Sequence, residues 1–308
     1  MELALITMNK IIEMVAIMMI GVVMLKTGIA DRETSKKLSS ILLNVISPCL
    51  IIMSYQMDFN EELLRGLLIT IILSAASFII AIALAHVSVP KKGNPNAAIE
   101  KMVVTYSNCG FIGIPIVNAI LGTEGVFYMT AYITVYNIFI WSHGLMLMSG
   151  RASSPVATAK NFIQPSTIAI IISLVLFVMN IHLPSVIASP FDMIGDMNTP
   201  VAMLISGINL AESDLVRSLK RPRTYLMSCL KLIAVPVFTA ILLAVVHTEM
   251  TIALTVIIAA ACPTGAMVTM FALQYKQDSN YASELFTITT VLSLITIPIV
   301  ILISGFIL

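Results

Sequence analysis

Residues 107–115 read Ser-Asn-Cys-Gly-Phe-Ile-Gly-Ile-Pro, and residues 262–265 read Cys-Pro-Thr-Gly. Each stretch interrupts a long apolar segment of the chain. A proline inside a helix removes one backbone N–H and clashes with the carbonyl group four residues back, and glycine leaves helical geometry at little cost. Irregular backbone is tolerated at membrane depth only where it is buried in protein or lines a watery cavity. The two stretches therefore predict two broken membrane helices.

The composition around these breaks is that of a membrane protein. Apolar residues make up 58% of the 308 residues and charged residues 11%, whereas soluble domains have about 25% charged residues. Mean hydropathy is +1.00. We expect a polytopic, all-α membrane protein, which excludes a soluble enzyme and a secreted disulfide scaffold, and a net charge of +1 argues against a nucleic-acid partner. Protease, ATPase and hydrolase motifs are missing from the sequence, so we expect neither an enzyme nor a cofactor, and no metal site.

The apolar segments predict ten transmembrane helices of about 20 residues each. They span residues 11–26, 38–56, 63–86, 97–121, 126–148, 165–181, 186–211, 225–247, 251–275 and 282–307. The polar stretch 149–164 is the longest between them and reads as a cytosolic linker. It divides the chain into a first five-helix repeat (1–148) and a second (165–308). Because five is odd, the two repeats would be inverted relative to each other in the membrane.

Basic residues in the short loops predict the orientation, since they concentrate on the cytosolic side. Of the 17 Lys and Arg residues, 14 fall on one side of the ten-helix prediction, two (Lys10 and Arg65) on the other, and Lys231 inside a span. The 14 are Lys26, Arg32, Lys36, Lys37, Lys91, Lys92, Lys101, Arg151, Lys160, Arg217, Lys220, Arg221, Arg223 and Lys276. We therefore expect both termini outside the cytosol, with the chain in the cell membrane.

The breaks fall in the fourth span of each half, and interrupted helices at matching positions of inverted repeats point to a transporter's binding site. If the breaks cross, the N-termini of the half-helices present free N–H groups and positive dipole ends, which suit a carboxylate. The candidate substrate-binding residues are Asn108, Cys109, Gly110, Pro115, Pro263, Thr264 and Gly265, with Asn44 on the opposite wall.

Two charged residues inside spans allow alternatives. Lys231 either tethers the ninth-span break and brings positive charge to the crossing, or extends along its helix to the cytosolic surface. Asp196 is either a coupling-ion or proton site or the cap of a distorted helix. Its stretch, 196–200, is similar to 44–48 in the first half, since both end in a hydroxyl residue followed by proline.

At these residues the chain resembles the auxin efflux carrier family, which includes the plant auxin exporters and bacterial malonate-type carriers. Plant members carry P-N-T-L-V-M-G-I-P where this chain has 107–115, and L-P-Q-G where it has 262–265. Further similarities are 164–168, Asp196 and the pair Lys231 and Pro236. This chain departs from the plant pattern at Ser107 and Thr264, and its short linker suits a prokaryotic member.

The resemblance implies the inverted five-plus-five fold of bile-acid and sodium/proton carriers. Helices 1, 2, 6 and 7 would form a scaffold, and helices 3–5 and 8–10 a mobile transport domain, usually in a homodimer. The implied function is elevator-type secondary transport of a small organic anion, with H⁺ or Na⁺ as a possible coupling ion. The alternatives are a sodium-coupled anion symporter, an anion channel and a transporter-like sensor.

Overall fold

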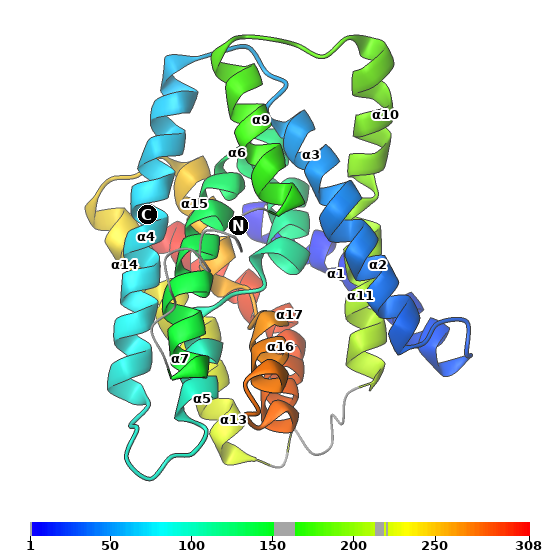
Figure 1. Ribbon diagram of the computed structural model, residues 1–308. Helices are drawn as coiled ribbons and strands as arrows, with labels where there is room; N and C mark the ends of the chain where they lie inside the picture. Colours follow the sequence, from blue (N-terminus) through cyan, green and yellow to red (C-terminus); the bar gives the residue numbers. More distant parts are fainter. Residues whose placement is uncertain (1, 151–163, 213–218, 220) are drawn as a thin grey trace.

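The computed structural model describes residues 2–150, 164–212, 219 and 221–308. Every regular element that it assigns in this part of the chain is a helix, so the expected all-α class is confirmed (Figure 1). Six helical stretches are long and apolar enough to cross a membrane, namely Met8–Lys26, Arg32–Ser54, Glu61–Ser88, Cys109–Ser149, Pro222–Val245 and Ser279–Ile307. Pro165–Val178 and Met250–Ala261 are shorter apolar helices.

Described helices overlap each of the ten predicted spans, but several spans are divided between two helices and α6 runs past the predicted end of the fourth span. In chain order they are α1 (Glu2–Lys26), α2 (Arg32–Ile41), η1 (Leu42–Ile46), α3 (Ser47–Ser54), α4 (Glu61–Ser88), α5 (Ala97–Thr105), η2 (Cys109–Gly113), α6 (Ile114–Phe139), η3 (Ile140–Gly144), α7 (Leu145–Ser149), α9 (Pro165–Val178), α10 (Ser185–Asp196), α11 (Asn198–Glu212), α13 (Pro222–Cys229), η4 (Leu230–Ala234), α14 (Val235–Val245), α15 (Met250–Ala261), α16 (Met267–Gln274) and α17 (Ser279–Ile307). The first helix begins nine residues before the predicted start at 11. Most of the predicted linker (151–163) lies outside the described residues, as do Arg151, Lys160, Arg217 and Lys220.

Proline explains where several helices widen into a π-turn. The turns η1, η2 and η4 each end just before a helix that has proline as its second residue, at Pro48, Pro115 and Pro236. Proline cannot donate the next helical hydrogen bond and its ring crowds the carbonyl four residues back. An extra residue in the turn relieves that clash, and π-turns of this kind are frequent at functional sites.

Gly122 lies inside α6 but is not helical, with φ of 64° and ψ of −153°. A positive φ is open to glycine at little cost because glycine has no Cβ. The chain therefore turns at this residue, one position after the predicted end of the fourth span at 121.

Helices α1 and α11 approach each other at backbone distance. A Cβ on Gly21 of α1 would collide with the carbonyl oxygen of Leu204, and a Cβ on Gly207 of α11 would collide with that of Met18. Small residues allow this close packing between membrane helices, where no hydrophobic effect drives association. The contact joins the first predicted span directly to the seventh.

Connecting segments meet at two opposite ends of the bundle. At the upper end in Figure 1, Phe59 donates its N–H to Asn180 (2.9 Å) and Leu183 donates its N–H to Gln56 (2.7 Å), which ties the α3–α4 loop to the α9–α10 loop. At the lower end, the start of α5 contacts the starts of α13 and α17. At each end of the bundle, segments that are far apart in the sequence are therefore held together.

Candidate functional site: the crossing of two broken helices

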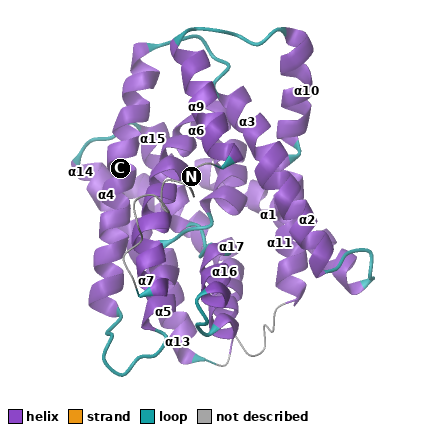
Figure 2. Cartoon of the chain, in the orientation of Figure 1, coloured by secondary structure: helices purple, strands orange, loops and turns teal. Residues whose placement is uncertain are grey.

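The two breaks lie against each other inside the bundle. Asn108 donates its N–H to the carbonyl of Pro263 (2.7 Å), and Gly265 donates its N–H to the carbonyl of Tyr106 (3.1 Å). Ser107 and Thr264 form an isolated antiparallel bridge. Figure 2 shows such non-helical connections in the interior of the helical bundle. The backbone groups freed by each break are thus paired with the other break, so the two breaks meet.

Lys231 fastens this crossing from the eighth predicted span. Its side chain is 0% exposed, and its Nζ donates to the Oγ of Ser107 (2.5 Å) and to the carbonyl of Ala260 (3.1 Å). Lys231 therefore does not extend to the membrane surface, which leaves the tether as its arrangement in the structure. The ammonium also lies near the carbonyl end of α15, where a positive charge is favourable.

Helix α17 holds the crossing from a further side. Thr264 donates its N–H to the Oγ1 of Thr289 (3.3 Å), and its own Oγ1 donates to the carbonyl of Tyr106 (3.4 Å). Four segments far apart in the sequence, namely α5, η4, α15 and α17, are therefore joined at one point. Such a point is rigid, because its polar groups are buried and paired.

The candidate substrate-binding residues surround this point. Asn108 is 8% exposed, and no other residue that the structure describes makes a hydrogen bond to its side chain. A Cβ added at Gly110 would meet no atom within 4 Å, so the space directly beside this backbone is open. Pro115 is buried at the start of α6, and Pro263 and Gly265 are buried in the second break.

Cys109 and Cys262 are buried on either side of Gly113. A Cβ on Gly113 would lie 3.3 Å from the Sγ of Cys262 and 3.5 Å from the Cβ of Cys109. Both cysteine side chains therefore lie next to the same glycine, one from each break. The same added Cβ would collide with the Cε of Met129, which can move aside.

Aromatic side chains pack behind the crossing, a feature that the sequence analysis did not identify. Phe78 of α4 stacks on Phe139 with a centroid separation of 5.2 Å and lies 5.1 Å from Tyr132. Tyr106 meets Tyr136 edge-on at 5.9 Å. These large side chains fill the space between the crossing and the fifth predicted span, so they limit the room for a ligand on that side.

Asn44 and Asp196 are not brought to the crossing by any described contact. Asn44 is exposed and donates to the Oγ of Ser40 (3.0 Å), and Asp196 is exposed at the end of α10. Their neighbours Ser47 and Asn198 form a buried hydrogen bond of 2.9 Å instead. The two similar stretches therefore do meet, but through residues that the sequence analysis did not select. The roles assigned to Asn44 and Asp196 stay predictions.

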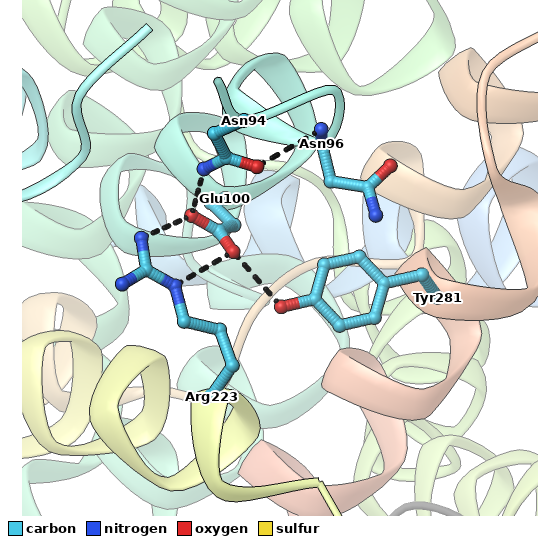
Figure 3. A network of polar contacts seen from close by, with 5 residues as sticks. All are labelled: Asn94, Asn96, Glu100, Arg223 and Tyr281. Carbon is cyan, nitrogen blue, oxygen red and sulfur yellow. Dashed lines mark hydrogen bonds and ion pairs between the residues drawn. The ribbon is translucent and has the colours of Figure 1, made fainter. Parts of the chain in front are cut away.

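A second polar cluster closes the lower end of these helices (Figure 3). Glu100 of α5 accepts two hydrogen bonds from Arg223 (2.9 and 2.7 Å), one from Asn94 (2.8 Å) and one from Tyr281 (3.0 Å). Bidentate Arg–carboxylate pairs are the strong ones. This buried carboxylate therefore joins α5 to α13 and α17, at the end of the bundle opposite the Gln56 contact.

The sequence contained partial signals for the residues that were missed. Ser107 stands in the quoted break, and a lysine inside a span needs an acceptor, so this pairing could have been proposed. Glu100 and Arg223 lie 123 positions apart, and no local pattern connects them. In the described ranges, no group of three or more His, Cys, Asp or Glu residues is placed to hold a metal ion.

Comparison with known proteins identifies the family of the chain. A model of the membrane transport protein family, which includes the auxin efflux carriers, matches residues 6–158 and again residues 149–301. The chain belongs to this family and is a multi-pass membrane transport protein, not an enzyme. It is also similar to an uncharacterized transporter of Methanothermobacter thermautotrophicus, with 22% identity over 298 residues that cover 94% of this chain and 96% of the relative.

Proposed function

We propose that this transporter is a secondary carrier of a small organic anion, specifically a carboxylate, that binds at the crossing. The observation that carries the proposal is the crossing itself: two broken helices bonded through Asn108, Pro263 and Gly265, with the fully buried ammonium of Lys231 beside them. A carboxylate there would meet half-helix N-termini, the free amide of Asn108 and a positive charge. The chemistry favours an anion over a cation.

The proposed architecture is ten spans in two inverted five-helix repeats. The family model matches each half once, which supports a duplication. The contacts of Gln56 with Leu183 at one end and of Glu100 with Arg223 at the other join loops that ten spans would place on the same side. With the basic loops in the cytosol, both termini would lie outside, and a reporter fused after Leu308 should be active only there.

The way in which the crossing is held supports elevator-type alternating access. The hydrogen bonds given above for the crossing come from the predicted spans 4, 8, 9 and 10, which belong to the proposed transport domain. The proposed scaffold, α1, α2, α3, α9, α10 and α11, has its own bonds at Ser47 and Asn198. The transport domain could therefore move with the crossing intact. A homodimer through the scaffold and coupling to H⁺ or Na⁺, with Asp196 as the candidate ion site, complete the proposal.

The test is a thermal-shift screen of the purified chain against monocarboxylates and dicarboxylates. A ligand at 100 times its dissociation constant stabilises a two-state system by about 2.7 kcal/mol. We expect at least one carboxylate to raise the unfolding temperature of the parent and of the control Thr27→Ala, which changes an exposed residue, but not that of Asn108→Ala. A carboxylate that stabilises all three proteins equally would move the binding site away from the crossing.

A further inference from the structure

A cavity of about 670 Å³ lies apart from the crossing, where the ends of α4, α5 and α7 come together at the lower left of Figure 1. Its size is that of a small-molecule site. The residues that line it are Ile82, His86, Lys91, Asn94, Ala97, Ala98, Lys101, His143, Met146, Leu147 and Gly150. Two lysines and two histidines thus face one space, and no Asp or Glu is among these described lining residues.

Lys101 is the unusual member of this cavity. Its residue is only 3% exposed, yet no acceptor for its ammonium is found among the residues that the structure describes. The adjacent carboxylate of Glu100 does not serve it, because both Glu100 oxygens are bonded to Arg223, Asn94 and Tyr281 (Figure 3). The Lys101 side chain lines the cavity, so an anion there would gain a favourable interaction with a charge that no described residue neutralises.

His143 is bonded through one ring nitrogen, Nδ1, and its other ring nitrogen, Nε2, has no described partner. Its Nδ1 lies 2.9 Å from the hydroxyl of Tyr106, and that hydroxyl donates to the carbonyl of Phe139 (2.9 Å). Because the hydroxyl proton of Tyr106 goes to the Phe139 carbonyl, Nδ1 of His143 carries a proton and donates it to the Tyr106 oxygen. The Nε2 of His143 is buried and has no hydrogen-bond partner in the described part of the chain. In the neutral ring Nε2 is an acceptor, and a bound anion would favour the protonated ring, in which Nε2 donates.

The start of α5 adds a further attraction for negative charge. Ala97 and Ala98 form the first turn of this nine-residue helix, and both line the cavity. The N–H of Ala97 is bonded to the carbonyl of Asn94 (3.3 Å), but the first turn still carries the positive end of the helix dipole. Lys91 lies on the exposed loop that leads into the same turn. Lys101, Lys91 and the start of α5 therefore favour an anion at one place, and His143 adds to them once it is protonated.

We propose that this cavity is a second anion site, which binds an oxyanion such as phosphate between Lys101, Lys91 and His143. The site is distinct from the crossing and does not depend on the proposed carboxylate transport. A free phosphate and the phosphate of a lipid headgroup have the same chemistry. Both can reach the cavity, because it opens at an end of the membrane helices. Lys101 would hold the oxyanion, and Lys91 would close the outer side.

The adjacent lysines of the α4–α5 loop offer a matched test. Lys91 lines the cavity, whereas Lys92 is exposed and lines a neighbouring hollow with Glu100 and Arg223. The full-length chain is placed in phosphatidylcholine nanodiscs and titrated with inorganic phosphate by calorimetry. We expect Lys101→Met to weaken binding at least 10-fold, because a hydrogen bond to a charged group is lost. Lys91→Met should weaken it about threefold, and Lys92→Met should bind like the parent.

The outcomes separate the possibilities. Phosphate binding that phosphatidylglycerol in the nanodisc weakens identifies a lipid headgroup as the ligand, and binding that it leaves unchanged identifies a soluble oxyanion. Both support the site. The proposal is overturned if phosphate does not bind in either lipid, if folded Lys101→Met binds like the parent, or if Lys91→Met and Lys92→Met behave alike. Asn108→Ala should bind phosphate normally, so failure at the crossing and failure here give different results.

Discussion

Replacement of Lys231 by methionine is expected to leave the protein folded while impairing anion binding and transport. The ammonium is 0% exposed and bonded to Ser107 and Ala260. Two hydrogen bonds from a charged group contribute about 3–6 kcal/mol in total, but burial of the ammonium costs several kcal/mol, which methionine does not incur. The Oγ of Ser107 lies 3.4 Å from the Ala260 carbonyl and can still donate to it. We therefore expect stability to fall by no more than about 2 kcal/mol.

The effect on an anion should be larger than the effect on the fold. A charge about 8 Å from the ligand contributes about 2 kcal/mol at an effective dielectric constant of about 20, which is about 30-fold in affinity. Lys231→Arg retains the charge, so it should transport better than Lys231→Met. Its larger side chain enters a fully buried site, and such overpacking costs about 1–3 kcal/mol.

The assay combines calorimetry on the anion found by the thermal-shift screen with thermal unfolding of the same samples. Ser107→Ala and the double variant Ser107→Ala/Lys231→Met complete a mutant cycle. Residues in direct contact show interaction energies of about 0.5–3 kcal/mol, so their effects on stability should not add. A folded Lys231→Met variant with the parent's affinity would refute the proposed charge at the crossing, and additive effects would refute the tether.

Three further results are expected. Asn108→Ala should weaken anion binding about 10- to 150-fold and Asn108→Asp should weaken it more, since it adds like charge; parent-like affinity in both would exclude the amide from the site. In single-cysteine variants, substrate should protect Cys109 or Cys262 from thiol reagents, and protection of neither would locate binding elsewhere. Glu100→Gln should lower the free energy of unfolding by about 1–3 kcal/mol because Arg223 loses its bidentate partner. The exposed control Glu33→Gln should lower it by under about 1 kcal/mol. Equal losses in the two variants would contradict the role of the buried pair.

The sequence predicted the crossing because its cause is local. Pro115 and Pro263, with their neighbouring glycines, break helices wherever they occur, and matching breaks in two halves leave few places for the freed backbone groups. The same reasoning connected Lys231 to the ninth-span break. The length of each apolar segment likewise predicted where the helices lie.

The remaining features depend on which face of a helix points inward. In a membrane helix both the lipid side and the core side are apolar, so periodicity does not reveal the face. Asn44 and Asp196 were selected, whereas the structure buries Ser47 and Asn198, which lie three and two residues further along the chain. The bond between Glu100 and Arg223 joins distant segments, and only the assembled helices bring them together.

Counterflow in proteoliposomes tests the central claim most directly. Vesicles that contain the parent protein are loaded with the unlabelled carboxylate identified by the thermal-shift screen, and uptake of the labelled carboxylate is followed from outside. A carrier with one alternating site at the crossing predicts that internal substrate accelerates uptake, and that Asn108→Ala abolishes the acceleration. Uptake that internal substrate does not accelerate would indicate a channel, and binding without any flux would indicate a sensor; either result would contradict the account.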